Sequence, residues 1–285
     1  MRLNSHIIAM LVEDISDPFF SAIARIIEEQ AHQQGYKIFY SSTGNDDTVA
    51  RDLIKVYRNA AAGAFIIAPT AGIGPEIAAL RQEAIPLVCF DRYIPGIPVK
   101  KVIVDNKQAA ILAVRHLWEN DYRRIAFVTL DSNQTQMTQR LEGYLESISH
   151  QYFPSLILRI PFGLAPAIMT HRIGAFLQLE APDAVIFATN YLAVSGLRAM
   201  SVLGANIPDD IAVLGFDDSP YFALCSPSIT AIAQPVQAIA QTILEYLTGA
   251  TTGRPDTTIL PVTLVARQST VPHSSILNPK QILPK

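Results

Sequence analysis

An internal repeat constrains the fold of this chain more than any other feature of its sequence. Short apolar segments of the first half return in the same order about 120 residues later, each followed by polar residues. The pairs are HIIAMLVED (6–14) with RRIAFVTLD (123–131), AGAFIIAPT (62–70) with PDAVIFATN (182–190), and IPLVCFDRY (85–93) with DIAVLGFDD (210–218). The repeat predicts two lobes of similar construction.

The repeated segments alternate with longer helical patterns, which is typical of βαβ units around a parallel sheet. After the strand at 6–14, Asp17 can cap a helix, Pro18 suits its first turn and Gly35 suits a left-handed exit. In the next helix, Val49, Leu53, Val56 and Ala60 are expected to share one apolar face, and Gly63 follows the helix. The predicted fold class is therefore α/β, with two similar doubly wound parallel-sheet lobes joined by several crossovers.

Two crossover segments set the lobe boundaries, because in each a strand runs into a helix that is expected to begin in the other lobe. They are KKVIVDNKQAAILAVRHLWEN (100–120) and TAIAQPVQAIAQTILEYLTG (230–249). We expect an N-terminal lobe of residues 6–104 and 235–250, and a C-terminal lobe of residues 105–232 and 257–270. An irregular tail is expected at 271–285, because VPHSSILNPKQILPK has three prolines and no apolar period. In parallel sheets of this kind, ligands bind beyond the carboxyl ends of the strands.

Composition excludes several classes of protein. The 285 residues are 49% hydrophobic, which is enough for sizeable cores, and the net charge is −3 without a cluster of Lys or Arg. A nucleic-acid-binding surface is therefore not expected on this chain. No signal peptide and no membrane span are indicated, so we expect a cytoplasmic protein. Cys89 and Cys225 are expected to be buried thiols rather than a disulfide.

The residues at the strand ends do not form a recognisable catalytic set. Asp217 and Asp218 should point to opposite faces, so they would not act as a pair of glycosidase carboxylates. The six histidines are scattered without metal-ligand spacing, and the nucleotide-binding and serine-nucleophile motifs are absent. We expect no cofactor and no metal. Acids, amides, an arginine and aromatic rings instead suit a small polar ligand such as a sugar or polyol.

Several motifs resemble, in order and spacing, the effector-binding domain of the LacI/GalR family of transcriptional regulators. The resemblance covers about residues 6–270. It rests on DISDPFFSAI (14–23), VIVDNKQAA (102–110), HLWENDYRRIAFV (116–128), QRLEGYLESI (139–148), IFATNYLAVSGLRAM (186–200), IPDDIAVLGFDDSPY (207–221) and PSITAIAQP (227–235).

The resemblance implies a two-lobed, periplasmic-binding-protein-like clamshell that closes on a small effector and thereby changes affinity for operator DNA. It implies that DNA is bound through an N-terminal helix-turn-helix, which we expect to be absent from this chain, and that the protein is a homodimer. Exposed apolar positions such as Val49 and Val56 could contribute to the dimer contact.

The resemblance also implies a set of effector-binding residues. Asp217 is expected to accept hydrogen bonds from ligand hydroxyls, whereas Asp218 turns away to stabilise its loop. The full set is Asp14, Ser16, Phe19, Asp105, Arg140, Phe162, Asn190, Asp217 and Gln234. The family commonly has aspartate where this chain has Tyr191, so the identity of the effector stays open.

Other interpretations remain. Asp14, Asp105, Asn106, Asn190 and Asp217 all stand where helix caps occur. Phe19 could belong to the core, and Asp91 with Arg92 could form a structural ion pair as easily as a site. A sugar-binding protein of a transport system shares the expected fold and is the main alternative function. An enzyme is a third, without a catalytic set to support it.

Overall fold

The computed structural model of the chain describes residues 5–249 and 255–272. The chain divides into two compact units, each built from several segments. Unit 1 contains residues up to Asp105, Asn133–Gln136 and Pro235–Pro261, and unit 2 contains Asn106–Ser132, Met137–Gln234 and the residues from Val262 onward. The tail predicted at 271–285 lies outside the described residues, apart from Val271 and Pro272.

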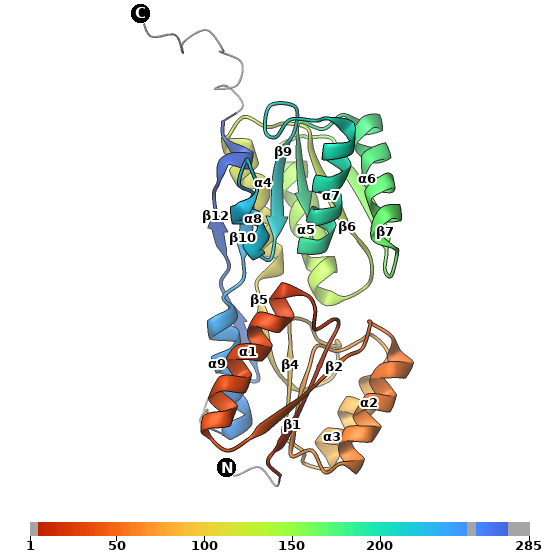
Figure 1. The fold of residues 1–285 in the computed structure, drawn as a ribbon, viewed down its shortest axis with the longest axis vertical. Coiled ribbons are helices and arrows are strands. Elements are labelled where there is room, and N and C mark those ends of the chain that lie inside the picture. Colours follow the sequence, from red (N-terminus) through yellow and green to blue (C-terminus); the bar gives the residue numbers. More distant parts are fainter. Residues whose placement is uncertain (1–4, 250–254, 273–285) are drawn as a thin grey trace, which may run out of the picture. The chain divides into compact units, whose positions relative to one another are not determined.

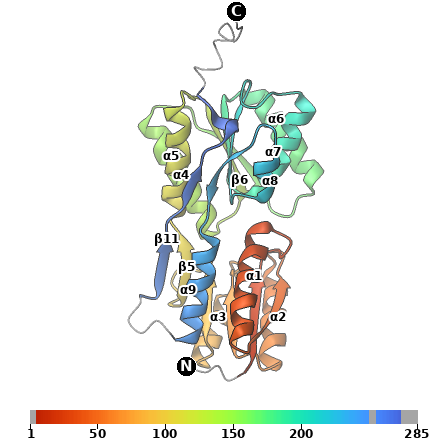
Figure 2. The ribbon, with the colours of Figure 1, turned by 60° about the vertical axis from the view of Figure 1, so that its left-hand side comes forward.

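Unit 1 is a six-stranded sheet with helices on both faces (Figure 1). Its strands are β1 (Ile7–Val12), β2 (Lys37–Ser42), β3 (Ala64–Ile67), β4 (Leu87–Phe90), β5 (Lys100–Val104) and β11 (Thr257–Leu260). Its helices are α1 (Pro18–Gln33), α2 (Asp47–Asn59), α3 (Gly74–Gln82) and α9 (Val236–Thr248). Helices α1 and α9 lie side by side on one face, and α2 and α3 cover the other (Figures 1 and 2).

Unit 2 repeats this plan. Its strands are β6 (Ile125–Asp131), β7 (Leu156–Pro161), β8 (Ala184–Phe187), β9 (Ala212–Phe216), β10 (Thr230–Ala233) and β12 (Thr263–Val265). Its helical elements are α4 (Asn106–Glu119), α5 (Thr135–His150, whose first two residues are counted with unit 1), α6 (Pro166–Glu180), α7 (Asn190–Leu203), α8 (Pro220–Leu224) and the 3-10 turn η1 (Gln268–Thr270).

The two sheets have the same topology, which confirms the fold predicted from the internal repeat. The strand orders are β11-β5-β4-β3-β1-β2 and β12-β10-β9-β8-β6-β7. All neighbouring strands are parallel except β10 and β12, which are antiparallel. Because helices cover both faces, the central strands are buried throughout and their sequences are continuous apolar runs rather than alternating ones.

One predicted lobe boundary is wrong. Residues 257–270 were assigned to the C-terminal lobe, but Thr257–Leu260 forms β11, which pairs in parallel with β5 in unit 1. The run TTILPVTLV resembles one extended strand, yet the chain completes the free edge of the first sheet before Pro261 and enters the second sheet only from Val262. The sequence shows no change of composition at this point.

The local helix signals in the first βαβ unit are confirmed. Asp17 caps α1 by accepting a hydrogen bond from the Phe19 backbone N–H, at 2.8 Å, and Pro18 is the first helical residue. Gly35 follows the helix with φ of +82°. In α2, Ala50, Ile54 and Tyr57 face the core.

Val49 and Val56 of α2 are 41% and 57% exposed. The helix carries two apolar stripes one residue apart, and the structure buries the one that ends in Tyr57, whose hydroxyl pairs with Ser41 Oγ. The other stripe is left on the surface.

Cys89 and Cys225 are free thiols. Cys89 is fully buried in β4, and burial raises the pKa of its thiol to about 12, so it stays protonated at neutral pH. Cys225 is only partly buried, contrary to the prediction. No helix within the described ranges is long and apolar enough to cross a membrane.

The packing of α4 against α5 depends on Gly143, and this gives a first test. A Cβ atom at Gly143 would lie 2.2 Å from the backbone oxygen of Lys107, so Gly143→Ala must push the two helices apart. We expect a loss of about 1–3 kcal/mol in unfolding free energy, measured by urea denaturation.

Gly174 in α6 is the matched control, since a Cβ there would meet only ordinary contacts, the nearest at 3.7 Å. Gly174→Ala should be neutral or stabilise the protein by up to about 1 kcal/mol, because alanine favours the helix. Equal effects of the two changes would contradict the close contact at Gly143.

Candidate functional site

Asp217 is the first residue after β9, and its backbone is in the left-handed region with φ of +63°. Its amide N–H donates to the carbonyl of Ile232 in the neighbouring strand β10, at 2.9 Å. Aspartate tolerates this conformation better than most residues with a side chain. The turn places the Asp217 carboxylate at the carboxyl edge of the unit 2 sheet.

Arg140 is the buried cation opposite Asp217. It lies in α5, is only 2% exposed, and its Nη2 is 3.7 Å from Asp217 Oδ1. Its Nε donates to Asn106 Oδ1 at 2.8 Å, and its Nη1 donates to the carbonyl oxygen of Ala188. The guanidinium also lies over the Phe216 ring, 4.3 Å from the centroid. These contacts hold the guanidinium plane in one orientation.

Gln234 completes the cluster from the end of β10. Its Nε2 donates to Asp217 Oδ1 at 2.6 Å. We call Asn106, Arg140, Asp217 and Gln234 the unit 2 polar cluster. Three of its four members were predicted as site residues. The cluster offers guanidinium N–H donors beside carboxylate and amide acceptors, which is a combination that suits ligand hydroxyl groups.

Asp218 faces away from this cluster, as predicted. Its carboxylate forms a bidentate pair with Arg267, with Nη1–Oδ1 and Nη2–Oδ2 distances of 2.6 and 2.9 Å. Arg267 is itself held, because its backbone N–H donates to Thr230 Oγ1 and its Nη1 donates to the carbonyl of Ile229. The pair therefore fixes the loop that carries Asp217 to the last segment of unit 2.

The other two predicted residues of unit 2 are placed differently. Asn190 is buried at the start of α7, two residues after the carbonyl of Ala188 that Arg140 contacts. Thr189, not Asn190, caps this helix by accepting from Leu192 N–H. Phe162 follows β7 and packs, half-buried, against the hydrophobic core of unit 2. The described contacts therefore give Phe162 a packing role.

In unit 1, three predicted residues share the loop and helix start after β1. Asp14 and Ser16 are exposed, and Asp14 Oδ1 accepts from the Ser16 N–H at 2.8 Å. Phe19 is only 7% exposed and packs edge-to-face on Phe20, with 5.2 Å between ring centroids. Asp105 is exposed at the end of β5, and its backbone N–H donates to the Leu260 carbonyl. These four residues lie at strand ends of the unit 1 sheet, as expected.

A second buried arginine lies at the strand ends of unit 1. Arg92 is 2% exposed; its Nη1 donates to Glu13 Oε2 at 2.8 Å and its Nε to the Pro69 carbonyl at 2.9 Å. Asp91 stands beside it, 3.4 Å from Nη1, with φ of +65°. The Gln136 amide reaches the same carboxylate at 3.5 Å.

Asp91 follows β4 as Asp217 follows β9, in nearly the same backbone conformation. The repeat therefore extends to the strained residue that ends the strand. Sequence reasoning left Asp91 and Arg92 undecided and considered Asn106 only as a helix cap. The alignment of FDRY with FDDS was the available signal for Asp91, and no sequence signal showed that Asn106 would contact Arg140.

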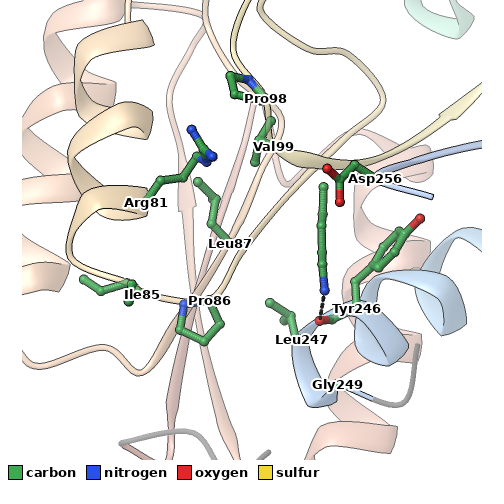
Figure 3. Close-up of a pocket in the computed structure, with 12 residues that line it drawn as sticks. Arg81, Ile85, Pro86, Leu87, Pro98, Val99, Tyr246, Leu247, Gly249 and Asp256 are labelled. Carbon is green, nitrogen blue, oxygen red and sulfur yellow. Dashed lines mark hydrogen bonds between the residues drawn. The ribbon is translucent and has the colours of Figure 1, made fainter. Parts of the chain in front are cut away.

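A pocket in unit 1 lies away from these residues. It has a volume of about 340 Å³ and is formed at the opposite, amino ends of β4 and β5 with the end of α9 (Figure 3). Lys100 donates to the Tyr246 carbonyl at 3.5 Å within it. Pro86, Leu87, Pro98, Val99 and Leu247 line it with apolar groups. Within the described ranges, no three His, Cys, Asp or Glu side chains are grouped so that they could hold a metal ion.

The Asp218–Arg267 pair gives a second prediction. Both side chains are partly buried, at 24% and 17% exposure, so the interaction should exceed that of a surface pair. Asp218→Asn and Arg267→Gln should each destabilise the protein. In urea denaturation the double variant should show a coupling energy of about 1 kcal/mol. Additive effects would mean that the pair does not hold the loop.

Comparison with known proteins agrees with this architecture. Residues 114–270 match the family described as "Periplasmic binding protein-like domain". The chain is 26% identical over 278 residues to the HTH-type transcriptional regulator DegA of Bacillus subtilis, covering 94% of this chain and 82% of the relative. It is 28% identical over 272 residues to the ribose operon repressor of Halalkalibacterium halodurans, covering 94% and 80%.

Solved structures show the same fold. A periplasmic binding protein/LacI transcriptional regulator from Alkaliphilus metalliredigens, in complex with D-xylulofuranose, has a TM-score of 0.82 at 24% identity and covers 94% of this chain and 100% of its own. A probable LacI family regulator from Corynebacterium glutamicum has a TM-score of 0.84 at 20% identity, covering 93% and 99%. Because the family match spans more than half of the chain, the chain belongs to the periplasmic binding protein-like domain family, and its relatives are LacI/GalR transcriptional regulators.

Proposed function

We propose that this chain is the small-molecule-sensing core of a LacI-type transcriptional regulator. Its effector is a sugar or related polyol, bound at the carboxyl ends of the sheet strands. The observation that carries the proposal is the unit 2 polar cluster, in which a buried arginine and a strained aspartate meet at the strand ends of a chain related to regulators. Buried, positioned polar groups of this kind are typical of ligand sites.

The relatives support this ligand class. One of them is named a ribose operon repressor, and related solved structures are complexes with D-xylulofuranose and cellobiose. For this chain, we assign effector contacts to Arg140, Asn190, Asp217 and Gln234 in unit 2. In unit 1 the resemblance implies Asp14, Ser16, Phe19 and Asp105. The packing of Phe162 within the core of unit 2 makes it the least supported of the nine predicted residues.

The mechanism proposed is a shift of population. An effector that binds one arrangement of the two units better than another favours that arrangement by the difference in its two affinities. Binding to operator DNA then changes through linkage with a DNA-binding segment of the regulator. Apart from the short segment Asn133–Gln136, which is counted with unit 1, the chain passes from one unit to the other at Asp105–Asn106, Gln234–Pro235 and Pro261–Val262. We propose that these three segments act as the hinges.

A sugar-binding protein of a transport system is the alternative, because it shares the fold. The curated relatives are transcriptional regulators, which favours regulation in the cytoplasm over transport and over catalysis. The discriminating observation is DNA binding. The whole regulator should retard a DNA fragment from upstream of its own gene, and addition of sugar should change that retardation.

The proposed function predicts ligand-induced stabilisation of this chain. At least one sugar among D-ribose, D-xylose, D-galactose, D-glucose and cellobiose should raise the melting temperature. At a concentration near 100 times Kd, the stabilisation is about 2.7 kcal/mol. Arg140→Lys should abolish the shift, because lysine cannot reproduce the planar set of N–H donors.

Arg81→Lys is the control for this experiment, since Arg81 lines the separate unit 1 pocket. That variant should keep the full shift. If no sugar changes the melting temperature, or if Arg140→Lys responds like the parent protein, the assignment of this cluster as the effector site is wrong.

We also propose that the regulator is a homodimer that uses the exposed apolar stripe of α2. Sedimentation at micromolar concentration should then give about twice the 31.2 kDa chain mass. Val49→Glu combined with Val56→Glu should yield monomers, because two carboxylates would be buried in the contact. Val202 is 82% exposed on α7, so Val202→Glu is the control. A monomeric parent protein would contradict the proposal.

A further inference from the structure

The pocket of unit 1 in Figure 3 lies apart from the residues assigned to the effector. It is lined by 12 residues, all of them within the described ranges, and its volume of about 340 Å³ is that of a small-molecule site. The pocket stands at the amino ends of β4 and β5, whereas the predicted effector residues of unit 1 follow the carboxyl ends of β1 and β5. A ligand bound here would therefore be separate from the effector.

One wall of the pocket is apolar because of the positions of two prolines. Pro86 directly precedes β4 and Pro98 stands two residues before β5, and proline has no backbone N–H to offer. Leu87, Val99 and Leu247 extend this wall. A ligand placed here meets hydrocarbon, so its polar groups must be bound by side chains from elsewhere in the pocket.

Tyr246 of α9 forms a second wall, and it is fixed in position. It is only 4% exposed, its hydroxyl donates to the Pro255 carbonyl at 2.6 Å, and the same hydroxyl pairs with Thr258 Oγ1 of β11 at 2.7 Å. The Lys100 ammonium lies over this ring, 5.3 Å from the centroid, and donates to the Tyr246 carbonyl. Lys100 is therefore held at the pocket.

The charged side chains of the lining leave one positive charge in excess, because Arg81 and Lys100 are opposed by Asp256 alone. Figure 3 shows Arg81 across the hollow from Tyr246 and Asp256. In the part of the chain that the structure describes, the Arg81 side chain forms no hydrogen bond and no ion pair. The Lys100 ammonium has three N–H donors, and its bond to the Tyr246 carbonyl is long, at 3.5 Å. Both cations thus keep donors for an acceptor in the pocket.

A carboxylate meets these requirements. It carries one negative charge, which matches the excess, and its two oxygens can accept from a guanidinium in the bidentate geometry. A phosphate monoester carries up to two charges, so it would bring surplus negative charge close to Asp256. The apolar wall in turn requires that the carboxylate be attached to a hydrocarbon or aromatic body.

We propose that this pocket is a second ligand site, and that it takes a small monocarboxylate with an apolar body. The carboxylate binds Arg81 and Lys100, and the body lies on Pro86, Leu87 and Pro98. The inference does not depend on the proposed function, because the pocket contains none of the residues assigned to the sugar.

The test measures the binding of matched small molecules to this chain by isothermal titration calorimetry. Benzoate and hexanoate have both features, benzyl alcohol and hexan-1-ol lack the charge, and acetate lacks the body. At least one of the two acids should bind, and it should bind at least about tenfold more tightly than its alcohol and than acetate, because the charged contact and the buried body both contribute. Phenyl phosphate should bind more weakly than benzoate.

Arg81→Gln tests the residue assigned to the carboxylate. Glutamine keeps hydrogen-bonding groups but removes the charge, so the acid should bind at least about tenfold more weakly, whereas the weak binding of the alcohol should not change. Arg81 is exposed, so the variant should fold as the parent chain does. Arg25→Gln is the matched control, since Arg25 lies on α1 of the same unit, is 78% exposed and pairs with Glu29. That variant should bind the acid like the parent chain.

Three results would overturn the inference: no binding of either acid, equal binding of an acid and its alcohol, or equal binding of the acid by the parent chain and Arg81→Gln. Tighter binding of phenyl phosphate than of benzoate would contradict the assignment of a singly charged ligand. None of these results concerns sugar binding, so the proposed function would stand in each case.

Discussion

The orientation of one buried guanidinium determines what the strand ends of unit 2 can bind. Arg140 reaches the sheet edge from α5 and is held by an amide of α4, a carbonyl after β8 and the ring that ends β9. A buried arginine without such partners would be strongly unfavourable. Each partner comes from a different element, so the cluster forms only when the helices and strands of unit 2 are correctly packed. The cluster therefore cannot form without the fold of unit 2.

The second constraint is the left-handed turn at Asp217. Strand β9 is fully buried up to Phe216, and the chain must then turn so that a carboxylate faces Arg140. The next residue, Asp218, is fixed by Arg267 on the other side. Two adjacent aspartates therefore have separate roles: one takes part in the polar cluster, and the other holds the loop. The same turn occurs at Asp91 in unit 1, which shows that it belongs to the repeated architecture.

Much of this could be predicted from the sequence, and the limits have physical reasons. The repeat of apolar segments indicated the fold class, because strands that alternate with helices form parallel sheets covered on both faces. The motifs around Arg140, Asp217 and Gln234 identified residues that do meet in unit 2. The assignment of β11 to unit 1 was missed, because the residues of a strand carry no local signal of which of two sheets the strand joins. The buried face of α2 could not be chosen from the sequence, because the helix has two apolar stripes and only tertiary packing selects between them.

Arg92 and Asn106 could not be assigned from the sequence for a different reason: their roles depend on partners that are distant in the chain.

The most direct test of the account is a crystal structure of the chain with the neutral sugar that binds it best. We predict one sugar hydroxyl within about 3.2 Å of both Arg140 Nη2 and the Asp217 carboxylate. A sugar bound elsewhere, with Arg140 and Asp217 contacting only each other, would contradict it.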